Sequence, residues 1–451
     1  MAQIRLHDTL SGALVELRPR EPGKVGIYAC GPTVYGRIHI GNARPFVVFM
    51  LLKRFLEHEG YQVTLVANIT DVNDKIYAAA LAAGTGSEAL AAEMGERYIS
   101  DTDGLGLGRP DHEPLASASM PEIIALIGLL IERRHAYVVD GDVYFAVRSY
   151  ARYGELSHQR LDELDQGEGV EGADRKRDPL DFALWKARKP GEDTAWDAAW
   201  GRGRPGWHIE CSAMAEQLLG LDFEIHGGGS DLVFPHHENE AAQTRAAHDR
   251  PLTRIWMHNG MMRLAQAKMS KSTGNVFLLH EALERYGRDV LLLYFCAGHY
   301  RQPIEFDAER LGQAATSVER FRELARRLES GASPSWSRSL RDQFFEALTD
   351  DFNTPRALAA AFEWVREANR AADRSVGDAD LREMLRVLAL ENLLELREVE
   401  APVEAVALMR ARDAARGARN WAQADALRDQ LRQLGWEVRD GPDGPQLVSA
   451  R

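Results

Sequence analysis

Apolar residues near the start of the chain form two short continuous runs with a helical repeat between them. Residues 24–30 (KVGIYAC) and residues 62–68 (QVTLVAN) have the composition of buried strands. Between them, residues 41–60 place apolar side chains at three- and four-residue intervals, which predicts an amphipathic helix. The three segments form a βαβ unit, so we expect a parallel sheet that binds ligands at the carboxyl ends of its strands.

An insertion at roughly residues 116–205 interrupts this α/β pattern. Residues 121–134 predict a helix and residues 136–147 a pair of strands. Residues 161–178 are rich in Gly, Asp and Glu, which indicates an exposed loop. Residues 222–225 predict a further strand, where the α/β pattern resumes.

The pattern becomes almost entirely helical after about residue 311. Residues 311–396 repeat apolar positions at helical spacing among many Arg and Glu residues, which predicts a helix bundle with solvated charged faces. A small end domain follows Pro402, with helices and then a strand and turn near residues 435–440. The predicted fold is α/β: a Rossmann-like parallel sheet in two halves (1–115 and 206–255) split by the insertion (116–205), a connecting domain (256–310), an all-α bundle (311–400) and a small α+β domain (401–451).

Composition excludes several classes of protein. The 451 residues are 45% hydrophobic and 27% charged, which is typical of a soluble globular protein. No apolar run reaches the roughly 18 residues of a transmembrane helix, and the N-terminus has no secretion-type apolar region, so we expect no membrane partner. Three cysteines cannot form a disulfide framework, which favours a cytoplasmic location. The net charge of −13 argues against a protein that coats nucleic acid non-specifically, but it permits a local basic face.

Four residues far apart in the sequence have the chemistry of one zinc site. Cys30 ends the first strand, Cys211 lies far downstream, and His236 and Glu240 follow it at helical spacing. Residues four apart share a helix face, and two thiolates, an imidazole and a carboxylate favour zinc over calcium or magnesium. The alternative is that the cysteines are buried apolar residues, which is how we interpret Cys296 in its apolar surroundings.

A short motif at the start of the first helix suits phosphate binding. His39 and Asn42 are three residues apart in His39-Ile40-Gly41-Asn42, so both can face an anion near the helix N-terminus. Gly41 lets a flat ring approach the backbone. Taken alone, this tetrapeptide is a weak signal.

Two later segments extend the same interpretation. The loop Lys268-Met269-Ser270-Lys271-Ser272 offers two lysines and two hydroxyls to a triphosphate, the alternative being a solvated turn. After the strand near residues 222–225, three glycines allow close backbone approach to a ligand and a following carboxylate can accept from ribose hydroxyls. The alternative is a flexible loop. These four residues are Gly227, Gly228, Gly229 and Asp231.

Taken together, the first-helix motif, the lysine loop and the Cys30/Cys211/His236/Glu240 set resemble the class I aminoacyl-tRNA synthetases and, within them, the cysteinyl-tRNA synthetase family. The resemblance covers essentially the whole chain and includes residues 68–75, 181–186 and 203–211. The chain departs from the general class motif at Asn42, where that motif ends in His; asparagine keeps one donor and one acceptor.

The resemblance implies a two-step reaction. L-Cysteine and ATP would give cysteinyl adenylate and pyrophosphate, and the cysteinyl group would then pass to the 3′ end of tRNA(Cys). His39 and Asn42 would hold the ATP phosphates from one side, with Lys268 and Lys271 closing on pyrophosphate from the other. Mg²⁺ would enter with ATP and be bound chiefly by it.

The resemblance also gives the zinc a purpose, because direct binding of the substrate thiolate distinguishes cysteine from serine. Thr70 and Trp207, and more weakly His208, are the candidates for the rest of the amino-acid pocket, although Trp207 can equally be core. Residues 116–205 resemble a connective insertion that places the tRNA acceptor end. Residues 256–310 resemble the connecting domain that carries the lysine loop, and residues 401–451 resemble an anticodon-binding domain. We expect a monomer.

Arginines of the end domain are the candidates for anticodon contacts, together with Trp436, which can instead be a core residue. Some of these arginines must pair with Asp413, Asp425 and Asp429. The arginines are Arg410, Arg412, Arg416, Arg419, Arg428 and Arg432.

Two other functions remain open. A cysteine:amino-sugar ligase of thiol biosynthesis shares the adenylation half but ordinarily lacks the terminal anticodon module. A non-catalytic, zinc-stabilised tRNA-binding paralogue would show decay of the lysine loop or of the His39 motif.

Overall fold

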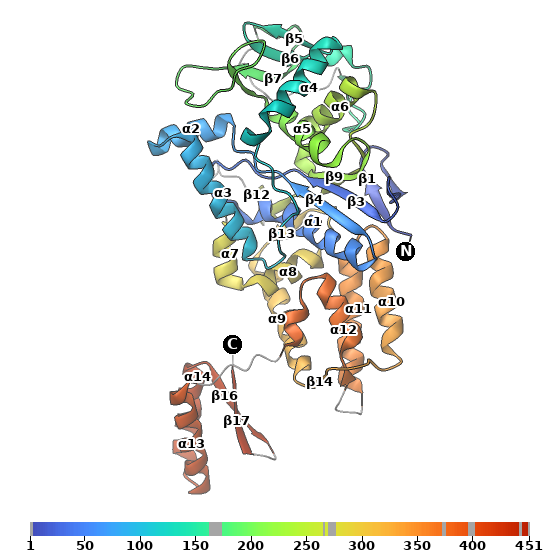
Figure 1. The fold of residues 1–451 in the computed structure, drawn as a ribbon. Coiled ribbons are helices and arrows are strands. Elements are labelled where there is room, and N and C mark those ends of the chain that lie inside the picture. Colours follow the sequence, from blue (N-terminus) through green and yellow to red (C-terminus); the bar gives the residue numbers. More distant parts are fainter. Residues whose placement is uncertain are drawn as a thin grey trace. The chain divides into compact units, whose positions relative to one another are not determined.

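The structure, a computed structural model, describes residues 3–161, 174–264, 267–268, 277–371, 376–395, 402–441 and 444–449. The chain divides into two compact units, Met1–Leu394 and Glu395–Arg451 (Figure 1). None of the helices in the described part of the chain is long and apolar enough to cross a membrane.

A four-stranded parallel sheet lies at the centre of the first unit. Its strands are β3 (Lys24–Ala29), β4 (Gln62–Ala67), β9 (Phe223–Gly229) and β10 (Thr253–Asn259), in the order β10-β9-β3-β4. The helix α1 (Ile40–His58) connects β3 to β4 and packs on one face, while α5 (Trp207–Leu219) packs on the other (Figure 1). The predicted βαβ unit and Rossmann-like α/β class are therefore confirmed.

Both faces of the sheet are apolar because the strands alternate their side chains between two cores. Ile27, Leu65 and Ile225 pack with α1, whereas Tyr28 and Phe223 pack on the α5 side. Burial on both faces explains why these strands appear in the sequence as continuous apolar runs.

The insertion contains a second, antiparallel sheet. The helix α4 (Met120–Glu132) precedes β5 (Ala136–Val139), β6 (Asp142–Phe145), β7 (Phe182–Ala187) and β8 (Gly203–Pro205), paired in that order. The helix and the first strand pair match the sequence predictions, but β7 and β8 were not predicted as strands. The predicted loop at 161–178 lies mostly outside the described residues.

Several shorter elements surround the central sheet. The first is the hairpin β1 (Arg5–Asp8) and β2 (Ala13–Glu16), and α2 (Asp74–Ala83) and α3 (Ser87–Asp103) follow β4. A three-stranded sheet in the order β12-β11-β13 joins β11 (Met262–Leu264), β12 (Ala267–Lys268) and β13 (Ile304–Phe306). Between β12 and β13 lie α7 (Leu279–Tyr286) and α8 (Arg288–Ala297), and Cys296 is buried in α8 as predicted. The single-turn elements are η1 (Ser117–Ser119), η2 (Val147–Ser149), η4 (Ser230–Leu232), η5 (Val233–His237) and η7 (Glu391–Leu394).

The rest of the first unit is the predicted helix bundle. It consists of α9 (Ala308–Ala325), α10 (Ser337–Thr349), α11 (Thr354–Arg370) and α12 (Ala379–Val387), with a minimal strand pair β14 (Leu328–Glu329) and β15 (Val376–Gly377). Phe321, Phe344 and Trp364 are fully buried and belong to the same apolar core as α1. The bundle thus packs directly against α1 of the parallel-sheet fold.

The second unit is a small α+β domain. It contains α13 (Val403–Gly417), α14 (Trp421–Gln433) and a hairpin of β16 (Trp436–Gly441) and β17 (Gly444–Ser449). Trp436 is buried with Ala405 and Leu431, so it is a core residue of this domain. Arg428 lies 3.2 Å from Asp425 and Arg432 lies 3.7 Å from Asp429, as the sequence led us to expect for some of the arginines.

His58, at the end of α1, connects the catalytic fold to the bundle. Its ring stacks on Phe345 of α10 with centroids 4.2 Å apart. Its Nδ1 lies 3.2 Å from a carboxylate oxygen of Glu59, and its Nε2 lies 2.9 Å from one of Glu383 in α12. The bond to Glu59, and after it the bond to Glu383, raises the pKa of His58 above its usual value.

We expect this contact to weaken as the pH rises. Because the folded-state pKa is the higher one, its stabilisation is fully present below about pH 6.5 and is lost as the pH passes through the raised value. The His58→Gln variant should lose up to about 1 kcal/mol of unfolding free energy near about pH 6, and less near about pH 8.5. Urea denaturation of both proteins at the two pH values measures this. An equal loss of unfolding free energy at both pH values would contradict a raised pKa of His58 as the source of this stabilisation.

Candidate active site

The candidate site lies at the carboxyl ends of β3 and β9. A cavity of about 280 Å³ opens there, between the residues that follow β3, the start of α1 and the segments that follow β9 and β10. This is the edge of the sheet at which the sequence predicted ligands to bind. Its lining includes Cys30, His39, Trp207, Asp231 and Met262.

The four predicted metal ligands come together beside this cavity, and Cys30 is the one among them that lines it. Their ligand atoms all lie within 4.8 Å of one another. Cys30 Sγ lies 3.6 Å from His236 Nε2 and 3.6 Å from a carboxylate oxygen of Glu240, and His236 Nε2 lies 2.9 Å from that same oxygen. Cys211, on α5, is also buried in the cluster. His236 is in η5 and Glu240 in α6 (Glu238–His248), so one continuous helical segment presents both side chains, as their spacing predicted.

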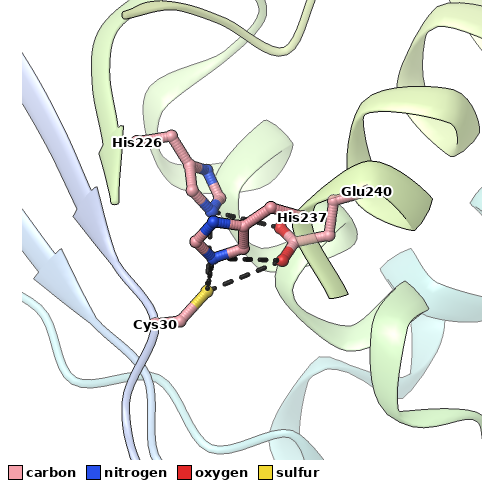
Figure 2. Close-up of side chains that lie close together, drawn as sticks. All are labelled: Cys30, His226, His237 and Glu240. Carbon is pink, nitrogen blue, oxygen red and sulfur yellow. Dashed lines mark hydrogen bonds and ion pairs between the residues drawn. The ribbon is translucent and has the colours of Figure 1, made fainter. Parts of the chain in front are cut away.

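A second group of side chains shares two of these ligands (Figure 2). The ring nitrogens of His226 and His237 approach Cys30 Sγ at 3.5 Å and 3.3 Å, and His226 Nε2 lies 3.3 Å from a carboxylate oxygen of Glu240. The set Cys30, His226, His237 and Glu240 also falls within 4.8 Å. The sequence analysis missed His226 and His237, although each stands beside a predicted site residue, Gly227 and His236 respectively.

The chemistry of the donors favours the set that contains both cysteines. Two thiolates make a softer and more negative site than one, which suits zinc. The hydrogen bond to Cys30 lowers the pKa of Cys211 to about 7, so a thiolate is available there near neutral pH. Burial raises the pKa values of Cys30 and Glu240, because it disfavours the charged form of each group.

The two overlapping sets can be separated by their metal content. We expect His236→Gln to reduce zinc affinity by about a hundredfold or more, because it removes a ligand. His226→Gln should reduce it by no more than about tenfold, because that side chain would support the site without binding the metal. Zinc per protein after dialysis against graded chelator, measured by mass spectrometry, distinguishes them. A larger loss of zinc affinity in His226→Gln than in His236→Gln would assign the metal to the set Cys30, His226, His237 and Glu240.

Trp207 and His208 cover His236 from two sides. The Trp207 ring stacks on the His236 ring with centroids 4.2 Å apart, and His208 Nδ1 lies 2.9 Å from His236 Nδ1. Trp207 is 36% exposed and lines the cavity, so it is not simply a core residue. His208 and Thr70 are buried and are not among the residues that line the cavity; Thr70 Oγ1 accepts a hydrogen bond from Asn68 Nδ2 at 3.0 Å.

The first-helix motif caps α1 at the opposite side of the cavity. The Asn42 amide N–H donates to His39 Nδ1 at 3.2 Å, and the His39 N–H donates to Asn42 Oδ1 at 3.4 Å. This reciprocal pair is a capping box, which fixes both side chains at the helix N-terminus. A Cβ on Gly41 would lie 2.9 Å from the His39 ring, so glycine is needed there to leave room for that ring. All three residues line the cavity.

The glycine run lies in a strand and is closely packed. His226 to Gly229 form the end of β9, not a loop, and only Gly229 and Asp231 line the cavity. A Cβ on Gly227 would lie 2.2 Å from the Met257 carbonyl oxygen and 2.3 Å from the Phe49 ring. Close packing therefore accounts for Gly227. ATP binding by Gly227 and Gly228 stays a prediction without support from the cavity lining.

The lysine loop falls largely outside the described residues, and Lys271 lies there. The backbone of Lys268 is described: it belongs to β12 and pairs with Arg263 of β11. Their roles at the triphosphate stay predictions.

Comparison with known proteins extends these observations to the whole chain. A model of the class I (C) tRNA synthetase catalytic domain matches residues 16–316. A cysteine–tRNA ligase of Pseudothermotoga lettingae is 47% identical over 98% of both chains, and one of Yersinia enterocolitica is 44% identical over the same shares. The chain belongs to the cysteine–tRNA ligase family.

The rest of the chain matches this family as well. The DALR domain matches residues 343–396 and the cysteinyl-tRNA ligase anticodon binding domain matches residues 398–447. Family membership and the predicted enzyme class, an aminoacyl-tRNA synthetase of the cysteine–tRNA ligase type, are thus confirmed.

Solved structures support the fold alone, because their sequence identity is low. Mycobacterium tuberculosis methionyl-tRNA synthetase in complex with methionyl-adenylate is 16% identical, with a TM-score of 0.60 over 82% of this chain and 90% of that chain. An Agrobacterium radiobacter LeuRS in a ternary complex with tRNA and LeuAMS is 13% identical, with a TM-score of 0.62 over 85% and 86%. The chain therefore shares its overall fold with these two synthetase structures.

Proposed function

We propose that the protein activates L-cysteine with ATP and transfers the cysteinyl group to the 3′ end of tRNA(Cys). The observation that carries this proposal is that Cys30, one of the clustered Cys30/Cys211/His236/Glu240 ligands, lines the same cavity as His39 and Asn42. A thiol-binding group and a phosphate-binding helix start thus face the same space, which is what joining cysteine to ATP requires. Full-length similarity to cysteine–tRNA ligases supports the same reaction.

We infer that Cys30, Cys211, His236 and Glu240 hold Zn²⁺. When bound, the ion would take the substrate sulfur as thiolate and thereby prefer cysteine to serine. A pocket that relies on shape alone rejects an analogue of this kind by only about a hundredfold. Thiolate coordination extends the discrimination to about 10⁴, or roughly 5.5 kcal/mol, so no separate editing step is needed.

Trp207 and His208 would act on the amino-acid side of the pocket. Stacking of Trp207 on His236 places an apolar face beside the thiol-binding group, where it excludes water from the substrate side chain. His208, buried against His236, would hold that ligand's ring in one orientation. Thr70 would hold in place the residues that follow Cys30. Its backbone carbonyl accepts a hydrogen bond from the Val34 N–H, and its own N–H donates to the Pro32 carbonyl, both at 3.1 Å.

On the ATP side, His39 and Asn42 would orient the triphosphate at the N-terminus of α1. Helix N-termini attract anions, and the capping box keeps both side chains at the same end of the helix. Gly229 and Asp231 would contact the nucleoside, and Lys268 and Lys271 would stabilise the charge that develops on pyrophosphate. Mg²⁺ would enter with ATP.

The other domains would serve the tRNA. Residues 116–205 would place the acceptor end, residues 256–310 would carry the lysine loop, and residues 401–451 would bind the anticodon. Trp436 belongs to the core, which leaves the exposed arginines as the candidate anticodon contacts. We further propose that the protein acts as a cytoplasmic monomer.

The amino-sugar ligase alternative fits less well. The match of residues 398–447 to an anticodon-binding domain is the feature that such a ligase ordinarily lacks. A non-catalytic paralogue is also disfavoured, because the lysine motif is intact in the sequence and the first-helix motif keeps His39 and Gly41 and departs only at Asn42.

Charging of unfractionated tRNA with radiolabelled cysteine tests the proposal. With ATP and magnesium, we expect label on tRNA that an excess of serine does not displace and that a zinc chelator abolishes. Cysteine-dependent pyrophosphate exchange without any label on tRNA would instead support the amino-sugar ligase, and absence of both activities would support the paralogue.

A further inference from the structure

Arg44, two residues after Asn42 on α1, is buried and donates hydrogen bonds to five backbone carbonyl groups. Its Nη1 donates to the carbonyls of Gly260 and, at 3.3 Å, Met261. Its Nη2 donates to three carbonyls of the segment between α8 and β13. These belong to His299 at 3.1 Å, Tyr300 at 3.1 Å and Gln302 at 2.6 Å. The side chain is 1% exposed.

The two segments that Arg44 joins also contact each other closely. The Gly260 N–H donates to Tyr300 O at 2.8 Å, and the Ile304 N–H donates to Met261 O at 3.1 Å. A Cβ on Gly260 would lie 2.4 Å from the carbonyl carbon of Gln302, so only glycine permits this approach. From here the chain continues directly into β11, which pairs with β13 on one side and with β12 on the other.

The lysine segment, residues 265–276, begins immediately after β11. Lys268 pairs through its backbone with Arg263, so its position follows from that of β11. At the other end of the segment, the Ile40 N–H donates to Phe277 O at 2.9 Å and the Leu279 N–H donates to Ile38 O at 3.0 Å. Both flanks of the lysine segment are therefore attached to the first turns of α1: one by backbone pairing beside His39, and the other by the Arg44 side chain.

An arginine is suited to this position for two physical reasons. Its planar guanidinium presents five N–H donors at fixed angles, so one side chain can serve carbonyls from two segments. Burial lowers the pKa of Arg44 only to about 10, so the group stays charged at neutral pH. Among the described residues it forms no ion pair with a carboxylate. Its charge is instead solvated by the carbonyl dipoles, and removing it would leave those buried acceptors without their donor.

We propose that Arg44 is a positioning residue for the adenylation step, fixing where the chain enters the lysine segment relative to His39 and Asn42. This inference rests on the proposed function, in which the two motifs grip one triphosphate from opposite sides. Arg44 does not line the cavity, so it acts through the backbone of residues 260–261 and not by touching ATP. A displacement of about 1 Å in such an arrangement can cost about a hundredfold in rate.

The test is cysteine-dependent pyrophosphate exchange by Arg44→Lys and Arg44→Met. We expect kcat to fall by about a hundredfold in the Met variant and about tenfold in the Lys variant, which keeps the charge but fewer donors. Zinc content and the Kd for cysteine, measured in the absence of ATP, should change by less than about twofold, because the metal set lies on other elements.

Arg288→Lys is the matched control. Arg288 also donates to backbone carbonyls, those of Leu105 at 2.9 Å and Ala389 at 2.7 Å, but it lies at the start of α8, away from the cavity. A merely structural role for Arg44 predicts that both Lys variants lower Tm and that neither changes kcat at a temperature where both are folded. That result would overturn the inference even if the Met variant failed to fold. A wild-type protein with no cysteine-dependent exchange would instead refute the proposed function itself.

Discussion

The Cys211→Ser variant is expected to lose most of its zinc and to bind cysteine at least about a hundredfold more weakly, roughly 3 kcal/mol, while its affinity for ATP changes by less than about twofold. Serine has nearly the same shape as cysteine but offers a hard, protonated oxygen in place of a soft thiolate. Because Cys211 is buried in α5, beside Cys30 and not among the residues that line the cavity, the substitution changes the donor set without reaching His39 and Asn42.

Two measurements check this result. Zinc per protein is read by mass spectrometry, and the dissociation constants of cysteine and ATP are read separately by calorimetry. Cys296→Ser is the matched control: Cys296 is equally buried, but it lies in α8 within the main apolar core. We expect that variant to lose some stability and to keep its zinc. Equal losses of cysteine and ATP affinity in Cys211→Ser would contradict the separation of the two subsites.

Replacement of Lys271 with alanine should have the second large effect. We expect pyrophosphate exchange to slow by about a hundred- to a thousandfold, because the ammonium group would stabilise charge that appears only as pyrophosphate leaves. Binding of cysteine should be nearly unchanged. The effect therefore appears in kcat for exchange and not in the Kd for cysteine.

The control for this substitution is Lys24→Ala. Lys24 pairs with Glu21 at 2.5 Å on the surface and lies at the opposite, amino end of β3 from the cavity. Its removal should leave exchange within about twofold of wild type. Unchanged exchange in Lys271→Ala would show that this lysine is not a catalytic residue. Binding of the triphosphate would then be assigned to His39 and Asn42.

The candidate site shows where reasoning from local pattern is reliable. Strand-like runs and helical spacing predicted β3, α1 and β4, and the four-residue interval predicted that His236 and Glu240 share a face. In the fold, Cys30 at the end of β3 and Cys211 on α5 then belong to one cluster with them. These predictions depend on backbone periodicity and on ligand chemistry, both of which are visible in a sequence.

Three features of the molecule, two of them in the site, lay beyond that reasoning. ATP binding by Gly227 stays a prediction, and the structure adds a reason for this glycine that the sequence did not show, the close packing of β9 against Phe49. His226 and His237 approach Cys30 because β9 lies beside β3 in the sheet and η5 follows the end of β9. In the small domain, the sequence allowed Trp436 to contact RNA or to be a core residue. The structure shows that it packs against Leu431 in the core.

By itself, the sequence determined the α/β class, the domain order, the family and the residue types that can bind a thiolate and a triphosphate. The tertiary structure alone decided which glycines face the cavity, which histidines surround the metal set, and that Arg44 joins the first-helix motif to the entrance of the lysine segment. The physical reason is that Arg44 bonds to backbone carbonyls, which every residue carries. Its partners therefore leave no pattern in the sequence, and only the path of the folded chain brings them within reach.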